Sequence, residues 1–208
     1  MHPSLEPYAA GIEIGNASAD NVAAFFFHNN DPETLAHTRK VAEHAREIAV
    51  RIGSDPALAE RAALLHDVSN VVPKAAMLEL AERLSLCVLE EERAYPRIVH
   101  QKLSMAMARD LFGVRDDAVL QAIECHTTLK AGAGELDKIL FVADKVSWEL
   151  PGKHPYQAAM RERLARNDLD GAVLVYLDHV WSQRDQLRLV HPWLIAARAE
   201  LQRAAEGS

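Results

Sequence analysis

The stretch Ala62-Ala63-Leu64-Leu65-His66-Asp67 is the most informative segment of this chain. It begins as an apolar helical run and ends on two adjacent side chains that can both bind a metal ion. Because a helix buries such a run, the His66-Asp67 pair is predicted to lie at the edge of a hydrophobic core. The imidazole and the carboxylate could then serve one cation. These residues alone leave the alternative of a core histidine bonded to its neighbour.

The composition indicates one mostly helical domain. The 208 residues are 49% hydrophobic, with nine glycines and nine prolines, which favours a helical globule with a real core. We expect residues 1–30 to form an N-terminal arm with a short helix, and residues 31–205 to form the domain. The net charge of −7 argues against a general nucleic-acid-binding protein, because such proteins gain affinity by neutralising phosphates.

The cysteines and the N-terminus predict a cytoplasmic protein. Cys87 and Cys125 are too few for a disulfide framework and lack the spacing of a zinc site. The N-terminus has no basic segment followed by an apolar core, so no secretory signal is expected. Phe25-Phe26-Phe27 is far too short to cross a bilayer, and no membrane partner is expected.

Helix start and stop signals divide the chain into successive helices with no convincing strand. Asp31-Pro32 starts a helix that runs to Gly53, and Ser54-Asp55-Pro56 starts the helix that carries His66-Asp67. Further helices are expected from Pro73, from Pro96 to Gly113, from Asp116 to His126, from Leu136 to about Trp148, over 156–165, over 169–187 and from Pro192. Residues 1–19 are predicted to be a loose arm, 85–95 a polar connector and Pro151-Gly152 a turn. The predicted fold class is all-α.

Separate predicted helices each bring a histidine or an aspartate to the end or the inward face of an apolar stripe. These residues are His37, His66, Asp67, His100, His126 and Asp144. Nitrogen and carboxylate ligands without thiolate suit iron, manganese, cobalt or zinc at a catalytic site. Six ligands exceed the need of one catalytic metal ion. Two ions that share the Asp67 carboxylate would use all six, and such a pair suits phosphoryl transfer.

The order H…HD…H…H…D resembles that of the HD-domain metal phosphohydrolases. The chain is most similar to the YqeK-type branch, the symmetrical diadenosine-tetraphosphate hydrolases of bacteria, from about His37 to Leu194. The resemblance rests on the segments 63–68, 98–100, 122–128 and 136–144. Within them, His126-Thr127-Thr128 and Ala143-Asp144 are more specific to that branch than the HD pair. The resemblance implies an HD-domain helical bundle with a two-metal site, and it places the family's ligands on the six residues named above.

The resemblance also implies an activity. The expected protein is a metal-dependent phosphohydrolase that cleaves a phosphoanhydride of a nucleotide, with diadenosine tetraphosphate giving two ADP. One or two first-row transition-metal ions are expected, iron before manganese, cobalt or zinc. Asp67, His100 and His126 are expected to be catalytic, and Asn70, Thr127, Lys130 and Lys145 to bind the substrate. A nucleoside monophosphate phosphatase and a non-catalytic nucleotide-binding sensor are the alternatives, and a homodimer is left open.

The chain departs from the family around the expected phosphate contacts. Ser69-Asn70 stands where the family has an Ala-Lys portion. Leu129-Lys130 follows the two threonines where the family has Gly-Arg, so a guanidinium fork is replaced by a point charge. After Ala143-Asp144 the family tends to read Ile-Glu-Pro-x-Arg, whereas this chain reads Val146-Ser147-Trp148-Glu149-Leu150-Pro151. All six metal ligands are thus retained, while the phosphate contacts are changed.

Overall fold

The computed structural model describes residues 2–148 and 154–207, and within these ranges the chain is helical with no strand. The all-α prediction is confirmed. The helices are α1 (Glu6–Ala9), α2 (Ala19–His28), α3 (Pro32–Ile52), α4 (Pro56–Leu65), α5 (Met77–Arg83), α6 (Glu90–Ala94), α7 (His100–Asp110), α8 (Asp117–Cys125), α9 (Glu135–Ser147), α10 (Pro155–Ala165), α11 (Leu169–Ser182) and α12 (Pro192–Glu206). The turn predicted at Pro151-Gly152 lies outside the described residues.

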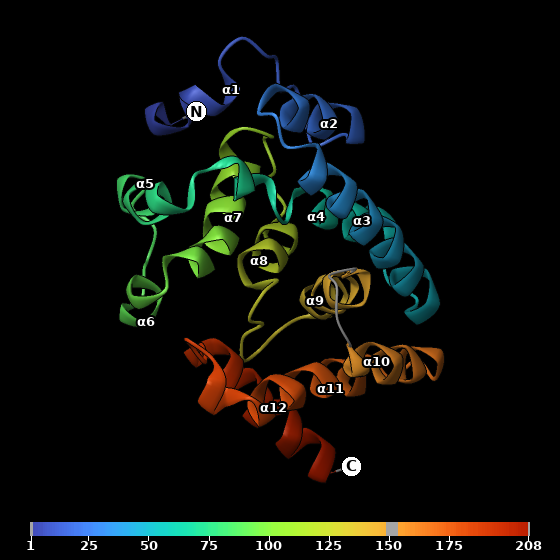
Figure 1. Cartoon of the computed structure of the whole chain (residues 1–208). Helices are drawn as coiled ribbons and strands as arrows, with labels where there is room; N and C mark the ends of the chain where they lie inside the picture. The colour runs from blue at the N-terminus through green and yellow to red at the C-terminus, as the bar shows by residue number, and fades with distance from the viewer. Residues whose placement is uncertain (1, 149–153, 208) are drawn as a thin grey trace.

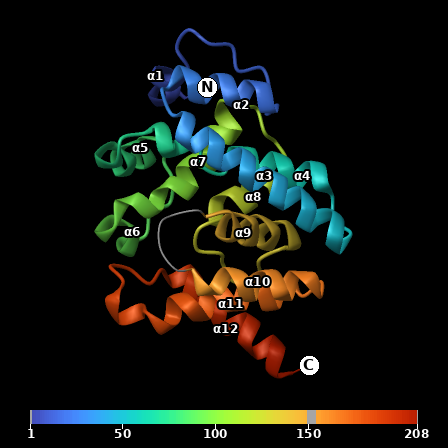
Figure 2. The ribbon, with the colours of Figure 1, turned by 45° about the vertical axis from the view of Figure 1, so that its right-hand side comes forward.

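The helices form a bundle with a central group and two covering groups (Figure 1). In the centre, α3 packs against α4 and α9, and α8 packs against α7, α4 and α9. The helices α1 and α2 cover one end, and α10, α11 and α12 cover the other, an arrangement that is also clear in the rotated view (Figure 2). No helix within the described ranges is long and apolar enough to span a membrane.

Capping residues fix where the central helices begin. Asp31 Oδ1 accepts a hydrogen bond from Thr34 N at 3.0 Å and Pro32 occupies the first helical position, as the sequence predicts. Asp55 and Asp116 cap α4 and α8 in the same way. The helix α4 ends at Leu65, before the His66-Asp67 pair that the predicted helix was to carry, so that His66 is its C-cap and Asp67 lies just beyond it.

Two segments that the sequence analysis left irregular are partly helical. Residues 3–9 form a 3-10 turn and α1, because Leu5 is fully buried in the core and anchors the arm. Within the polar connector, residues 90–94 form α6, whose first turn is closed by a hydrogen bond from Leu89 N to Glu92 Oε2 at 2.8 Å. Pro96–Val99 is a 3-10 helix rather than the first turn of an α-helix. The burial of Leu5 and the hydrogen bond to Glu92 thus form local structure that periodicity alone did not indicate.

Glu92, Lys102 and His191 form a buried polar cluster that joins α6, α7 and the start of α12. Glu92 Oε2 accepts a hydrogen bond from Lys102 Nζ at 2.8 Å, and Glu92 Oε1 lies 3.1 Å from His191 Nε2. Burial by itself raises the pKa of Glu92. The hydrogen bonds from His191 and Lys102 outweigh burial, so that the pKa of Glu92 lies below its usual value.

We expect Glu92→Gln to lower the free energy of unfolding by about 3–5 kcal/mol at neutral pH, because Lys102 then lacks its buried anion. Because the folded-state pKa of Glu92 is depressed, its contribution is present above the unfolded pKa and is lost as the pH falls through the folded pKa. Urea unfolding measured over this pH range should therefore show the deficit shrinking toward acid pH. Glu90→Gln, at a carboxylate whose side chain is 91% exposed, is the control. A deficit that does not change with pH would contradict this role of Glu92.

Candidate metal centre

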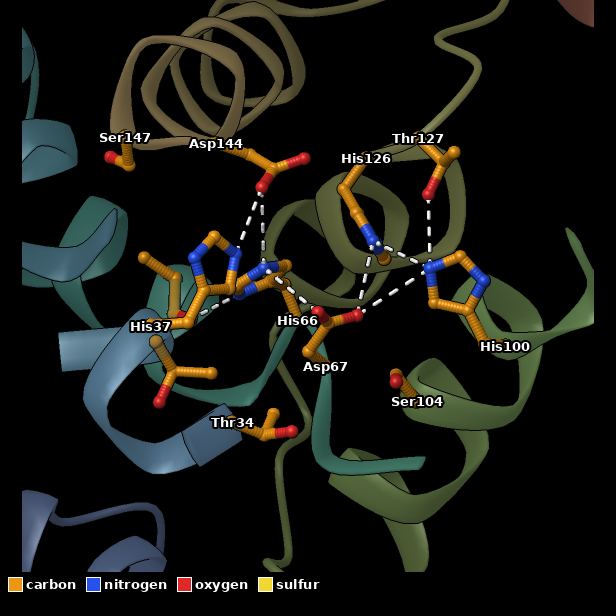
Figure 3. Close-up of polar contacts among 12 residues, drawn as sticks. Thr34, His37, His66, Asp67, His100, Ser104, His126, Thr127, Asp144 and Ser147 are labelled. Carbon is orange, nitrogen blue, oxygen red and sulfur yellow. Dashed lines mark hydrogen bonds and ion pairs between the residues drawn. The ribbon is translucent and has the colours of Figure 1, made fainter. Parts of the chain in front are cut away.

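The six residues predicted as metal ligands converge at one point between the central helices (Figure 3). The protein positions them from five places: His37 on α3, the His66-Asp67 pair at the end of α4, His100 at the start of α7, His126 at the end of α8 and Asp144 on α9. With the exception of His66, which is fully buried beneath them, they line a cleft of about 270 Å³. Residues separated by more than 100 positions in the chain are therefore in contact here.

Three of the histidines are oriented by the same backbone contact. The Nδ1 atoms of His66, His100 and His126 lie 2.6, 2.8 and 2.9 Å from the carbonyl oxygen of the residue three positions earlier in the chain. A carbonyl oxygen can only accept, so each Nδ1 carries a proton and donates it, and in a neutral imidazole the Nε2 atom then presents a lone pair. The cause is local: all three histidines stand at the junction between a helix and its neighbouring turn.

These lone pairs face one another and the Asp67 carboxylate. The Nε2 atoms of His100 and His126 are 3.1 Å apart, and Asp67 Oδ1 lies 3.4 Å from the first and 3.6 Å from the second. The other oxygen, Asp67 Oδ2, lies 3.6 Å from His66 Nε2. In the described part of the chain, the buried atoms His66 Nε2 and Asp67 Oδ1 have no hydrogen-bond partner. Lone pairs this close repel unless a cation lies among them, so the donor set fits a metal ion.

The protonation states of the cluster also suit metal binding. Burial lowers the pKa of both His66 and His100 to about 4, so both imidazoles are neutral at physiological pH. Burial raises the pKa of Asp67, but the surrounding imidazoles, His66 first, outweigh it and hold the pKa well below its usual range. His66 and His100 therefore offer neutral nitrogen donors beside an ionised carboxylate.

Asp144 and His37 complete the side of the centre near α3 and α9. Asp144 Oδ1 lies 3.1 Å from His37 Nε2 and 3.8 Å from His66 Nε2. Its other oxygen lies 2.5 Å from Lys145 Nζ, which also donates to the carbonyl of His126 at 3.0 Å. Burial raises the pKa of Asp144, but the Lys145 charge and the His37 hydrogen bond lower it well below its usual value. Lys145 thus fixes Asp144 with Oδ1 turned toward the histidines.

The donor atoms fall into two groups that share Asp67. The atoms of His37, His66 and Asp67 lie within 4.8 Å of one another, and so do those of Asp67, His100 and His126. Figure 3 shows the Asp67 carboxylate between the two sets of rings. A carboxylate with one oxygen toward each group could serve a metal ion in either group.

Buried polar residues behind the ligands hold their backbone in place, and the sequence analysis missed them. Ser69 Oγ donates to the carbonyl of His100 at 2.8 Å, and Ser104 Oγ donates to Ser69 Oγ at 2.9 Å. Gln101 Oε1 accepts from Thr127 N at 3.2 Å. Such outer contacts orient metal ligands. The signal that could have revealed them is the presence of polar Gln101 and Ser104 beside the apolar residues Leu103 and Met107 of α7.

The four residues predicted to bind substrate divide into two pairs. Thr127 and Lys145 line the cleft, and the Thr127 hydroxyl lies 3.1 Å from His100 Nε2. Asn70 and Lys130 are not among the described lining residues. Lys130 Nζ lies 3.4 Å from Glu124 Oε2, after a backbone turn in which Leu129 has a φ of +56°. The other described residues that line the cleft are Tyr95, Arg97, Ile98, Trp148 and Tyr176.

Comparison with known proteins places the chain in a family. The model of the HD domain family matches residues 34–149, more than half of the chain. An uncharacterized protein in the pepC 5′ region of Lactococcus lactis subsp. cremoris is 43% identical over 141 residues, which cover 68% of this chain and 71% of that protein. A Bacillus subtilis (strain 168) protein named bis(5′-nucleosyl)-tetraphosphatase, symmetrical, is 30% identical over 142 residues, which cover 66% of this chain and 72% of that protein.

A solved structure agrees with the sequence matches. The crystal structure of a Clostridium acetobutylicum protein, described as a predicted HD superfamily hydrolase involved in NAD metabolism, superposes with a TM-score of 0.82 at 25% identity. The superposition covers 91% of this chain and 100% of that one. Together with the matches above, it shows that this chain belongs to the HD domain family of hydrolases, in the YqeK branch that the Bacillus subtilis relative represents.

Proposed function

We propose that this protein is a metal-dependent phosphohydrolase that cleaves a phosphoanhydride bond of a nucleotide, with diadenosine tetraphosphate giving two ADP. The observation that carries the proposal is the Asp67 carboxylate, whose two oxygens face two separate sets of buried imidazole nitrogens beside a cleft. Two-metal sites of this kind catalyse displacement at phosphorus. The Bacillus subtilis relative, which is named a symmetrical bis(5′-nucleosyl)-tetraphosphatase, supports this choice of substrate.

The two ligand groups would hold one metal ion each. His37, His66, Asp67 and Asp144 would bind the first ion, and Asp67, His100 and His126 the second. The mixture of imidazole and carboxylate donors suits iron, manganese, cobalt or zinc, and we expect iron first because of the resemblance to the YqeK-type hydrolases. Ions of this kind supply Lewis acidity toward phosphate oxygens and lower the pKa of bound water to about 7.

The side chains around the ligands orient the reactants. The Thr127 hydroxyl and the Lys145 ammonium both line the cleft, where they can donate hydrogen bonds to phosphate oxygens. The ammonium is buried, so its charge acts on the phosphate through a medium of low dielectric constant. Tyr95, Trp148 and Tyr176 give the same cleft an aromatic surface on which a nucleobase can stack.

We expect the protein, loaded with iron or manganese under reducing conditions, to convert diadenosine tetraphosphate to ADP alone, because the cut is symmetrical. Chromatography of the products checks this result, and the chelator-treated protein is the control. AMP together with ATP would contradict a symmetrical cut. Phosphate release from AMP without turnover of any dinucleotide would identify a monophosphatase instead, and tight nucleotide binding without turnover would identify a sensor.

A further inference from the structure

We propose that Arg97 binds a phosphate group of the substrate next to the one held at the metal centre, and so selects ligands with at least two linked phosphates. The proposal rests on the proposed function, because it assigns a contact to the polyphosphate of that substrate. Arg97 lies outside every segment in which the sequence predicted a phosphate contact. The site it forms takes a nucleoside polyphosphate, recognised through one phosphate at the metal ligands and a second at the guanidinium.

The backbone holds Arg97 beside the metal ligands. Arg97 lies in the 3-10 helix Pro96–Val99, directly before His100, and its carbonyl oxygen is the acceptor for His100 Nδ1 at 2.8 Å. Its side chain lines the same cleft as Asp67 and His126. Arg97 therefore lies in the wall of the cleft that the metal ligands line.

The charge of Arg97 is available to a ligand. Its guanidinium forms no hydrogen bond or ion pair with any described carboxylate, and the residue is only partly exposed. The other cation that lines the described cleft, Lys145, is already paired with Asp144 at 2.5 Å. A partly buried cation without an anion is unfavourable, and a phosphate relieves this cost. The planar guanidinium can also bind two phosphate oxygens at once, which an ammonium cannot.

The surroundings of Arg97 favour a nucleotide over inorganic polyphosphate. Tyr95 and Ile98 flank Arg97 in sequence and line the cleft with it, and Trp148, 38% exposed, lines the cleft as well. Aromatic and apolar surface next to a cation suits a base joined to a phosphate chain. Lys130 pairs with Glu124 and is not among the described residues that line the cleft.

The test compares ligands with one and two phosphates on manganese-loaded protein by titration calorimetry. The probes are AMP and α,β-methylene-ADP, which adds a second phosphate through a bond that cannot be hydrolysed. We expect Arg97→Gln to bind the methylene analogue about 10- to 100-fold more weakly while its affinity for AMP changes by less than about 3-fold. Arg97→Lys should recover part of the loss, since it keeps the charge and loses the fork.

Arg93→Gln is the matched control. Arg93 lies four residues earlier, pairs with Glu82 on the surface and is not among the described residues that line the cleft. Equal affinity of Arg97→Gln and wild type for the methylene analogue would overturn the proposal, and so would an equal loss for AMP and the analogue. Metal content, measured on each variant, should stay at the wild-type level. The proposed function is tested separately. Wild-type protein that hydrolyses no phosphoanhydride would contradict it, whatever the calorimetry shows for Arg97.

Discussion

Asp67→Asn protein is expected to lose metal from both ligand groups together with all measurable turnover. The carboxylate is the one residue shared by the groups, with Oδ1 toward His100 and His126 and Oδ2 toward His66. Asparagine keeps the shape of the side chain but removes the negative charge that offsets two cations. Loss of residues that merely support ligands weakens metal binding 10- to 100-fold, so loss of the shared ligand should weaken it by more than about 100-fold. Turnover should fall by about 1,000-fold or more, because the metal contributes several kcal/mol to transition-state stabilisation.

Elemental analysis of the purified variant and turnover of diadenosine tetraphosphate measure the two effects. Asp185→Asn is the control for loss of a carboxylate, since that side chain is 87% exposed and distant in sequence from every ligand. Circular dichroism distinguishes loss of metal from loss of the fold. Full metal occupancy in folded Asp67→Asn protein would defeat the assignment of Asp67 as the shared ligand.

The fold was largely predictable because its helix ends depend on local chemistry. Asp31, Asp55 and Asp116 each cap a helix through their own side chains, and Gly53 ends α3 with a φ of +83°. Such signals need no knowledge of the rest of the chain. The short helices α1 and α6 escaped prediction because their cause is distant: Leu5 is buried in the core, and Glu92 pairs with Lys102 and His191.

The candidate site likewise has some features with local causes and others that depend on tertiary structure. Each ligand stands at the end or on the inner face of an apolar stripe, so its place near the core follows from periodicity. The pairing of ligands depends on tertiary structure, because His37 and Asp144 meet across 107 positions of sequence. The dependence on tertiary structure also explains why the sequence predicted only some of the side chains that line the cleft. Whether Lys130 reaches the cleft depends on the turn at Leu129 and on Glu124, and the place of Arg97 depends on the 3-10 helix before His100.

Single substitutions in the two ligand groups should have unequal effects on metal content. We expect His126→Ala to lower it by about half, from two ions to one, and to abolish turnover. His126 belongs to the group that it forms with Asp67 and His100, and the other group keeps all its donors. We expect Asp144→Ala to empty the centre more completely. Asp144 supplies a donor and also neutralises the buried Lys145 ammonium at 2.5 Å, which would otherwise repel a bound cation.

Elemental analysis of both variants beside the wild type separates the two groups, and His28→Ala, at an exposed histidine at the end of α2, is the control. Adding Lys145→Met to Asp144→Ala removes the unpaired ammonium. If that charge contributes to the loss, the double variant should recover part of the metal that the single variant loses. Equal and total loss in His126→Ala and Asp144→Ala would indicate a single ion or a strictly cooperative pair. Unchanged metal content and full activity in His126→Ala would exclude a two-metal centre, because that variant leaves the second group only Asp67 and His100 as donors.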